Sequence, residues 1–68
     1  MQDRYLNEKQ VAELTGISVN TLRTWRWARA YLPFLKISRR KVMYRESDVL
    51  AFMDKKRIEV NDKGVYRN

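Results

Sequence analysis

The stretch Asn7–Trp25, NEKQVAELTGISVNTLRTW, contains two short helix signatures on either side of a tight break at Gly16. Asn7 is a favoured N-cap, and Gln10, three residues later, completes the pattern of a capping box. Gly16 suits the position after a helix, where the backbone needs a positive φ. Ser18 suits the cap of a second helix. Two helices joined so closely predict a helix-turn-helix.

Apolar residues at helical spacing predict which faces of these two helices are buried. Val11, Ala12 and Leu14 fall on one side of the first helix, and Leu22 and Trp25 fall on one side of the second. Each helix also has a hydrophobic staple pair, Leu6 with Val11 and Ile17 with Leu22. Pro33 is expected to end the second helix.

Downstream of Pro33 the pattern changes to the alternation of β-strands. Strands are expected from Phe34 to Ser38 and from Val42 to Arg45, joined by a turn at Arg39-Arg40-Lys41. This turn lacks the Asn-Gly chemistry of a tight hairpin, so its type stays open.

A third helix is expected to begin near Glu46, with either Arg45 or Ser47 as its cap. Val49, Phe52 and Met53 form its apolar stripe. The predicted fold is α+β: a winged helix-turn-helix made of helix, turn, recognition helix, two-stranded β-hairpin wing and C-terminal helix. We assign residues 1–57 to this domain and residues 58–68 to a flexible C-terminal tail.

Basic residues are concentrated in one part of the chain. The net charge is +7, and no acidic residue occurs between Leu14 and Arg45. That segment contains eight basic residues: Arg23, Arg26, Arg29, Lys36, Arg39, Arg40, Lys41 and Arg45. A block of one sign attracts polyanions, so the composition favours nucleic acid as the partner.

Several classes of protein are disfavoured by what the 68 residues lack. There is no cysteine and no histidine, so neither a disulfide framework nor a zinc site is expected. No convergent pair of carboxylates and no glycine-rich phosphate loop is evident, so the protein is not expected to be an enzyme or to bind a cofactor. No signal peptide or membrane span is recognisable, which favours a cytoplasmic protein.

The segment from Leu6 to Met53 resembles the excisionase-like winged-helix DNA-binding domains of the MerR superfamily. The resemblance rests on the segments YLNEKQVA (5–12), GIS (16–18), TLRTW (21–25), KISRR (36–40), YR (44–45) and DV (48–49), with Phe52 after them. Within that superfamily the chain is similar to the lambda-type phage excisionases, which are recombination directionality factors. It departs from them at the hairpin tip, where Arg40 replaces a common glycine, and at Trp27, which is usually polar.

The resemblance implies roles for the recognition helix. Asn20 and Thr24 fall where the family contacts bases in the major groove. Arg23 and Arg26 are expected to reach guanine or phosphate. Ser18 and Thr21 are expected to cap the helix, to contact phosphate, or both.

The resemblance also implies a role for the wing, in which Arg40 enters a minor groove while Arg39 and Lys41 contact flanking phosphates. Trp27 has three candidate placements. It packs under the wing, stacks on a sugar or base, or meets a neighbouring protomer. All of these recognition-helix and wing residues are therefore candidates for the site.

Three functional hypotheses are compatible with these features. The first is a phage or mobile-element excisionase that binds and bends specific double-stranded DNA at direct repeats, self-associates side by side, and assists an integrase at the bacterial nucleoid. The second is a small transcriptional regulator with the same domain. The third is a protein-interaction module whose basic face meets an acidic partner.

Overall fold

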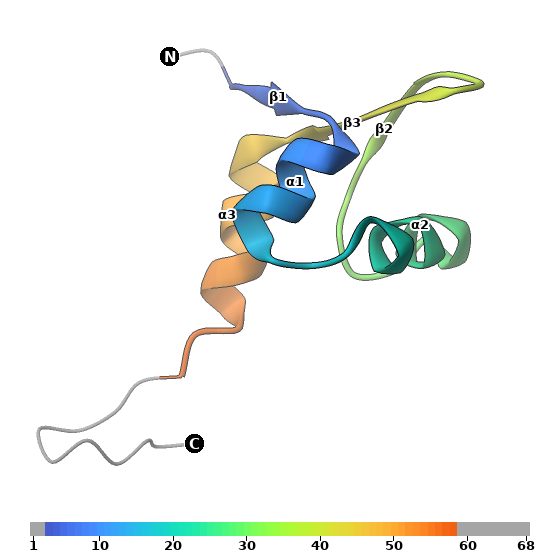
Figure 1. The fold of residues 1–68 in the computed structure, drawn as a ribbon. Coiled ribbons are helices and arrows are strands. Elements are labelled where there is room, and N and C mark those ends of the chain that lie inside the picture. Colours follow the sequence, from blue (N-terminus) through green and yellow to red (C-terminus); the bar gives the residue numbers. More distant parts are fainter. Residues whose placement is uncertain (1–2, 59–68) are drawn as a thin grey trace, which may run out of the picture.

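The computed structural model describes residues 3–58, which form three helices and a small antiparallel sheet (Figure 1). The elements in order are β1 (Tyr5–Leu6), α1 (Glu8–Thr15), α2 (Val19–Ala28), β2 (Leu35–Ser38), β3 (Lys41–Arg45) and α3 (Glu46–Lys55). The α+β winged helix-turn-helix predicted from the sequence is confirmed. The proposed tail lies outside the described residues except for Ile58, so the boundary at residue 57 stays a prediction.

The predicted caps of the first two helices are present. The Gln10 N–H donates to Asn7 Oδ1 at 2.8 Å, and the Asn7 N–H donates to Gln10 Oε1 at 2.9 Å. Gly16 has φ 78°, and its N–H donates to the Ala12 carbonyl at 2.8 Å. The positive φ explains the glycine, because a residue with a Cβ is strained in this region.

The second helix ends earlier than the sequence predicted. It stops at Ala28 because Arg29 takes a left-handed conformation, with φ 52° and ψ 47°, and closes the helix with its own N–H. Tyr31 also has a positive φ, of 71°. The prediction that Pro33 ends the helix was therefore wrong, since the chain has already turned at Arg29.

The sheet has one more strand than the predicted hairpin. Its order is β1-β3-β2, and β1 pairs with β3 through Tyr5 opposite Arg45 and Leu6 opposite Tyr44. The sequence showed no sign of this pairing, because the two strands are far apart in the chain. The added strand fixes the start of α1 against the base of the hairpin.

The hairpin turn is shorter than predicted. Lys41 pairs with Ser38 inside the ladder, so only Arg39 and Arg40 form the tip. Both have negative φ, which excludes the I′ and II′ turns of most two-residue hairpins. The register shifts between Lys36 and Ser38, where Ile37 is an extra residue in β2. Such a bulge bends the strand and allows another turn type at the tip.

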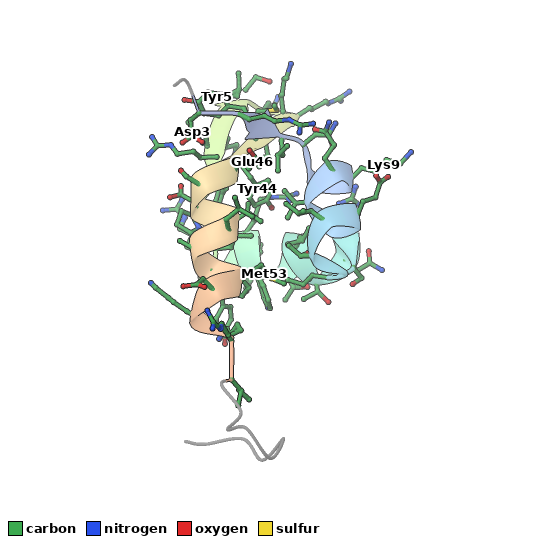
Figure 2. The ribbon with its side chains drawn as sticks, turned by 90° about the vertical axis from the view of Figure 1, so that its left-hand side faces the viewer. Asp3, Tyr5, Lys9, Tyr44, Glu46 and Met53 are labelled. Carbon is green, nitrogen blue, oxygen red and sulfur yellow. The ribbon has the colours of Figure 1, made fainter. Side chains whose placement is uncertain are left out.

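The core consists of six buried apolar residues: Leu6, Val11, Leu22, Leu32, Tyr44 and Val49. Figure 2 shows Tyr44 between α1 and α3, near the middle of the molecule. Trp25 and Phe52 pack against this cluster as predicted. Two other expectations were wrong, since Leu14 is 49% exposed and Met53 is 37% exposed.

The N-terminus of α3 is capped by a residue from the other end of the domain. Arg45 occupies the N-cap position but makes no side-chain cap bond. Instead, Asp3 accepts from the Ser47 hydroxyl at 2.7 Å and from the Ser47 N–H at 3.3 Å. In Figure 2, Asp3 lies beside the first turn of this helix. The sequence leaves open whether Arg45 or Ser47 caps α3. The carboxylate of Asp3 instead accepts the hydrogen bonds that a capping side chain at either position would accept.

Candidate nucleic-acid interface

The exposed face of α2 carries two of the predicted base-reading residues. Asn20 and Thr24 are one turn apart, and both are exposed. The Thr24 hydroxyl donates to the Asn20 carbonyl at 3.0 Å. No residue in the described range bonds to the Asn20 side chain. Its amide therefore offers both a donor and an acceptor to an incoming ligand.

Ser18 is the N-cap of α2, and it caps the backbone N–H of Thr21. The Thr21 N–H donates to Ser18 Oγ at 3.1 Å, and the Ser18 hydroxyl donates to Thr21 Oγ1 at 2.9 Å. The capping role expected for Ser18 is confirmed, whereas the Thr21 side chain only accepts a hydrogen bond from the Ser18 hydroxyl. The partial positive charge of a helix N-terminus favours anions, so this end of α2 suits a phosphate.

Both arginines of α2 are paired with Glu8, the first residue of α1. Arg23 binds it in a two-point arrangement, with Nη2 to Oε2 at 2.6 Å and Nε to Oε1 at 3.3 Å. Arg26 Nη2 donates to Glu8 Oε1 at 3.1 Å, and its Nη1 donates to the Tyr44 hydroxyl at 2.8 Å. Glu8 thus ties α1 to α2, and Arg26 ties α2 to the wing.

The two arginines differ in exposure. The Arg23 side chain is 59% exposed, whereas that of Arg26 is 18% exposed. Hydrogen bonding to Arg23 lowers the pKa of Glu8, with a smaller contribution from Arg26, and the same bond raises the pKa of Arg23. Glu8 and Arg23 are therefore both charged at neutral pH.

The wing residues carry charge that the rest of the described chain does not neutralise. Arg39, Arg40 and Lys41 are exposed, and none of them belongs to an ion pair within residues 3–58. Arg39 and Arg40 form the tip, whereas Lys41 begins β3. Adjacent unpaired cations repel one another, so this tip favours an anionic partner.

A cleft of about 970 Å³ separates the C-terminal half of α2 from the hairpin. The cationic residues of its lining are Arg23, Arg26, Arg29, Lys36 and Arg39, and no acid from the described part of the chain lines it. In Figure 1, α2 and the hairpin lie on the side of the domain away from α3. The recognition helix and the wing therefore share one basic surface.

A second, smaller groove of about 370 Å³ lies between the start of α1, the recognition helix and the wing. It is lined by Glu8 together with Arg23, Arg26, Arg39, Arg40 and Lys41. The carboxylate of Glu8 thus stands among five cations.

Trp27 does not pack within the fold. Its side chain is 88% exposed at the rim of the larger cleft, so the placement under the wing was wrong. Trp27 follows Asn20 and Thr24 on the same stripe of α2, two turns from Asn20. An aromatic ring left in solvent on a basic surface is suited to an intermolecular contact.

Four residues that shape this surface were not among the site residues predicted from the sequence. Arg29 and Lys36 line the cleft, and they were noted only as part of the basic block. Glu8 and Tyr44 bind the recognition-helix arginines, and no periodicity in the sequence could have linked them. An acid such as Glu8 is common in the first turn of a helix, so its residue type gave no signal of a second role.

Two features of other kinds of site are absent from residues 3–58. This part of the chain contains no cluster of three or more potential metal-binding side chains. None of its helices combines the length and hydropathy that crossing a membrane requires.

The fold and its basic surface define a DNA-binding helix-turn-helix protein of the winged type. Comparison with known families agrees, since residues 5–57 match the model of the helix-turn-helix domain family. The chain belongs to this family, which includes excisionase-like DNA-binding proteins. No curated protein and no solved structure matches the chain.

Proposed function

We propose that the protein is an excisionase, a recombination directionality factor that binds and bends specific double-stranded DNA and promotes excision by an integrase. The observation that carries the DNA-binding part is the cleft between α2 and the hairpin, which is lined by five cations and by no acid of the described part of the chain, with Asn20 and Thr24 exposed on α2. The excisionase role rests on the sequence resemblance and on the family match.

In the proposed complex, α2 lies in the major groove with Asn20 and Thr24 at base edges. Asn pairs with adenine in a bidentate manner, and the Thr methyl group contacts thymine. Ser18 and Thr21 lie at the end of α2 that favours phosphate. Arg26 is already bonded to Tyr44 and Glu8, so its part is to hold α2 against the wing rather than to read a base.

The wing then enters the neighbouring minor groove. Arg40 is the residue that inserts, because it stands at the tip with no ionic partner in the described part of the chain. A narrow A·T-rich groove concentrates negative potential and attracts such an arginine. Arg39 and Lys41 contact the phosphates on either side.

Trp27 contacts either a deoxyribose or base at the edge of the major groove, or a neighbouring copy on the DNA. Its 88% exposure and its position on the Asn20 face support both placements. A single module of this size buries roughly 600–1,000 Å² on DNA, which is too little for tight binding alone. We therefore propose that several copies bind side by side at direct repeats.

Footprinting on the DNA that flanks the protein's own gene tests the proposal. We expect protection of repeated sites, and we expect the complex to migrate most slowly when the site lies at the centre of a permuted fragment, as bending requires. A mobility-shift titration at several salt concentrations should give an affinity that falls steeply with salt. An affinity independent of salt would instead favour an acidic protein partner.

An excision assay separates the excisionase from a transcriptional regulator with the same domain. Purified integrase from the same element is incubated with an attachment-site substrate, with and without this protein. Excision that depends on the protein supports the proposal. Equal excision in both reactions, together with a footprint over a promoter, would assign the regulator role.

A further inference from the structure

The Glu8 carboxylate is, within residues 3–58, the one acidic group that lines either groove of the interface. It neutralises part of the charge of Arg23 and Arg26, while the wing cations in the same groove have no ionic partner in the described part of the chain. A carboxylate in this groove repels the phosphates of DNA. The position of Glu8 therefore needs an explanation in terms of DNA binding.

Given the DNA-binding function proposed above, we propose that Glu8 is a specificity-determining residue that suppresses binding to non-cognate DNA by holding Arg23 away from phosphates. Arg23 is the movable partner, since its side chain is 59% exposed and, in the described part of the chain, bonded to Glu8 alone. Arg26 is held by a second bond to Tyr44 and stays in place.

Non-specific and specific complexes with DNA gain affinity in different ways. Non-specific binding comes almost entirely from phosphate neutralisation and counterion release. A protein on non-cognate DNA adopts any register, so each free cation finds a phosphate. An arginine already paired with a carboxylate releases fewer counterions. Glu8 therefore removes about one phosphate contact from the non-specific complex.

The specific complex depends less on this contact. Its register is set by base-reading residues, proposed to be Asn20 and Thr24, so a freed Arg23 gains affinity only where that register brings a phosphate within reach. Removing the charge of Glu8 should thus help non-cognate DNA more than cognate DNA. The ratio of the cognate affinity to the non-cognate affinity should fall.

The test compares Glu8→Gln with Glu13→Gln, which removes the same charge from an exposed position on α1 that lies outside both grooves. The probes are a duplex selected by the wild-type protein from a randomised pool and a scrambled duplex of the same composition. For Glu8→Gln on the scrambled duplex we expect a log–log salt slope steeper by about 0.9, which is on the order of a tenfold gain at 0.1 M salt. Glu13→Gln should leave both the slope and the affinity ratio close to wild type.

A second variant keeps the test valid if Glu8→Gln folds poorly, which a melting curve would show. Because Glu8 already occupies Arg23, Arg23→Gln should change the salt slope on the scrambled duplex much less than Arg40→Gln, which should flatten it by about 0.9. Equal effects of those two variants would overturn the proposal. So would equal effects of Glu8→Gln and Glu13→Gln, or a loss of affinity confined to the selected duplex, which would make Glu8 a positioning residue for Arg23.

The same measurements distinguish failure of the DNA-binding proposal from failure of the inference about Glu8. If the wild-type protein selects no duplex and its binding does not respond to salt, the DNA-binding proposal falls. If the wild-type protein binds as expected and the variants at Glu8 and Glu13 behave alike, only the inference about Glu8 falls.

Discussion

Arg26 of the recognition helix donates a 2.8 Å hydrogen bond to the hydroxyl of Tyr44 in β3. Tyr44 is 1% exposed and pairs with Leu6 of β1 in the sheet. This side-chain hydrogen bond thus connects the helix proposed to face the major groove to the base of the wing. The bond adds to the core packing of Leu22 and Tyr44, which also joins these two elements.

Tyr44→Phe should lower stability and weaken DNA binding together. The mutation leaves a largely buried guanidinium without one of its acceptors, which costs about 1–2 kcal/mol. For a domain of this size the melting temperature should fall by about 5–15 °C. Tyr31→Phe is the matched control, since the Tyr31 side chain is 68% exposed and its hydroxyl has no bond in the described range. Equal melting temperatures for the two variants would contradict the structural role of the bond.

Asp3→Asn should flatten the dependence of stability on acid pH. Hydrogen bonding from the Ser47 side chain is the main cause that lowers the pKa of Asp3 below its ordinary value of 3.8. A lowered folded pKa means that the ionised form stabilises the fold above pH 3.8, and that this contribution is lost as the pH falls through the folded pKa. Urea denaturation at a series of pH values measures it. The wild type should be more stable than Asp3→Asn near neutral pH, and the difference should shrink in acid. A constant difference would refute the linkage.

Arg29→Gly should affect stability and binding in opposite directions. Glycine adopts the left-handed backbone at this helix end without the strain of a side chain, so unfolding should cost about 0.5–1 kcal/mol more. The same change removes a cation from the cleft lining. A thermal melt and a DNA titration check the two effects, and Arg29→Ala serves as the control that loses the charge and keeps the strain. A glycine variant that is less stable than the alanine variant would contradict the expected relief of strain.

Arg40→Ala should weaken binding mainly at sites with A·T-rich minor grooves. An arginine inserted into a narrow groove is attracted by its potential, whereas a phosphate contact is indifferent to sequence. Titrations on duplexes that differ only in the sequence beneath the wing measure the difference. Lys55→Ala, at the far end of α3, controls for the loss of one charge. The same loss on every duplex would reduce Arg40 to a phosphate contact.

Asn20→Ala should relax sequence preference at one base pair while the protein stays folded. The exposed amide makes no internal hydrogen bond in residues 3–58, so little stability should be lost. A bidentate contact with adenine contributes about 1–3 kcal/mol of discrimination. Selection from a randomised pool by the wild type and the variant reveals the position concerned. An unchanged consensus sequence would exclude Asn20 as a reader.

Local residue types are enough to predict the helix-turn-helix, the two strands of the hairpin and the basic character of the segment between Leu14 and Arg45. The caps at Asn7 and Ser18 and the left-handed glycine at position 16 use hydrogen bonds that span at most four residues. Such bonds depend on local residue types, so their pattern can be read directly from the chain. The absence of acids from Leu14 to Arg45 also needs no structure to be recognised.

Which of those cations have an ionic partner within residues 3–58 depends instead on the packing of elements that are far apart in the chain. Glu8 meets Arg23 across 15 residues of chain and Arg26 across 18, while Asp3 reaches Ser47 across 44. The pairing of β1 with β3 and the exposure of Trp27 depend likewise on how distant elements pack. Contacts between residues so far apart in the chain leave no periodic pattern in the sequence. Their partners are brought together by the folding of the chain and not by a regular residue spacing.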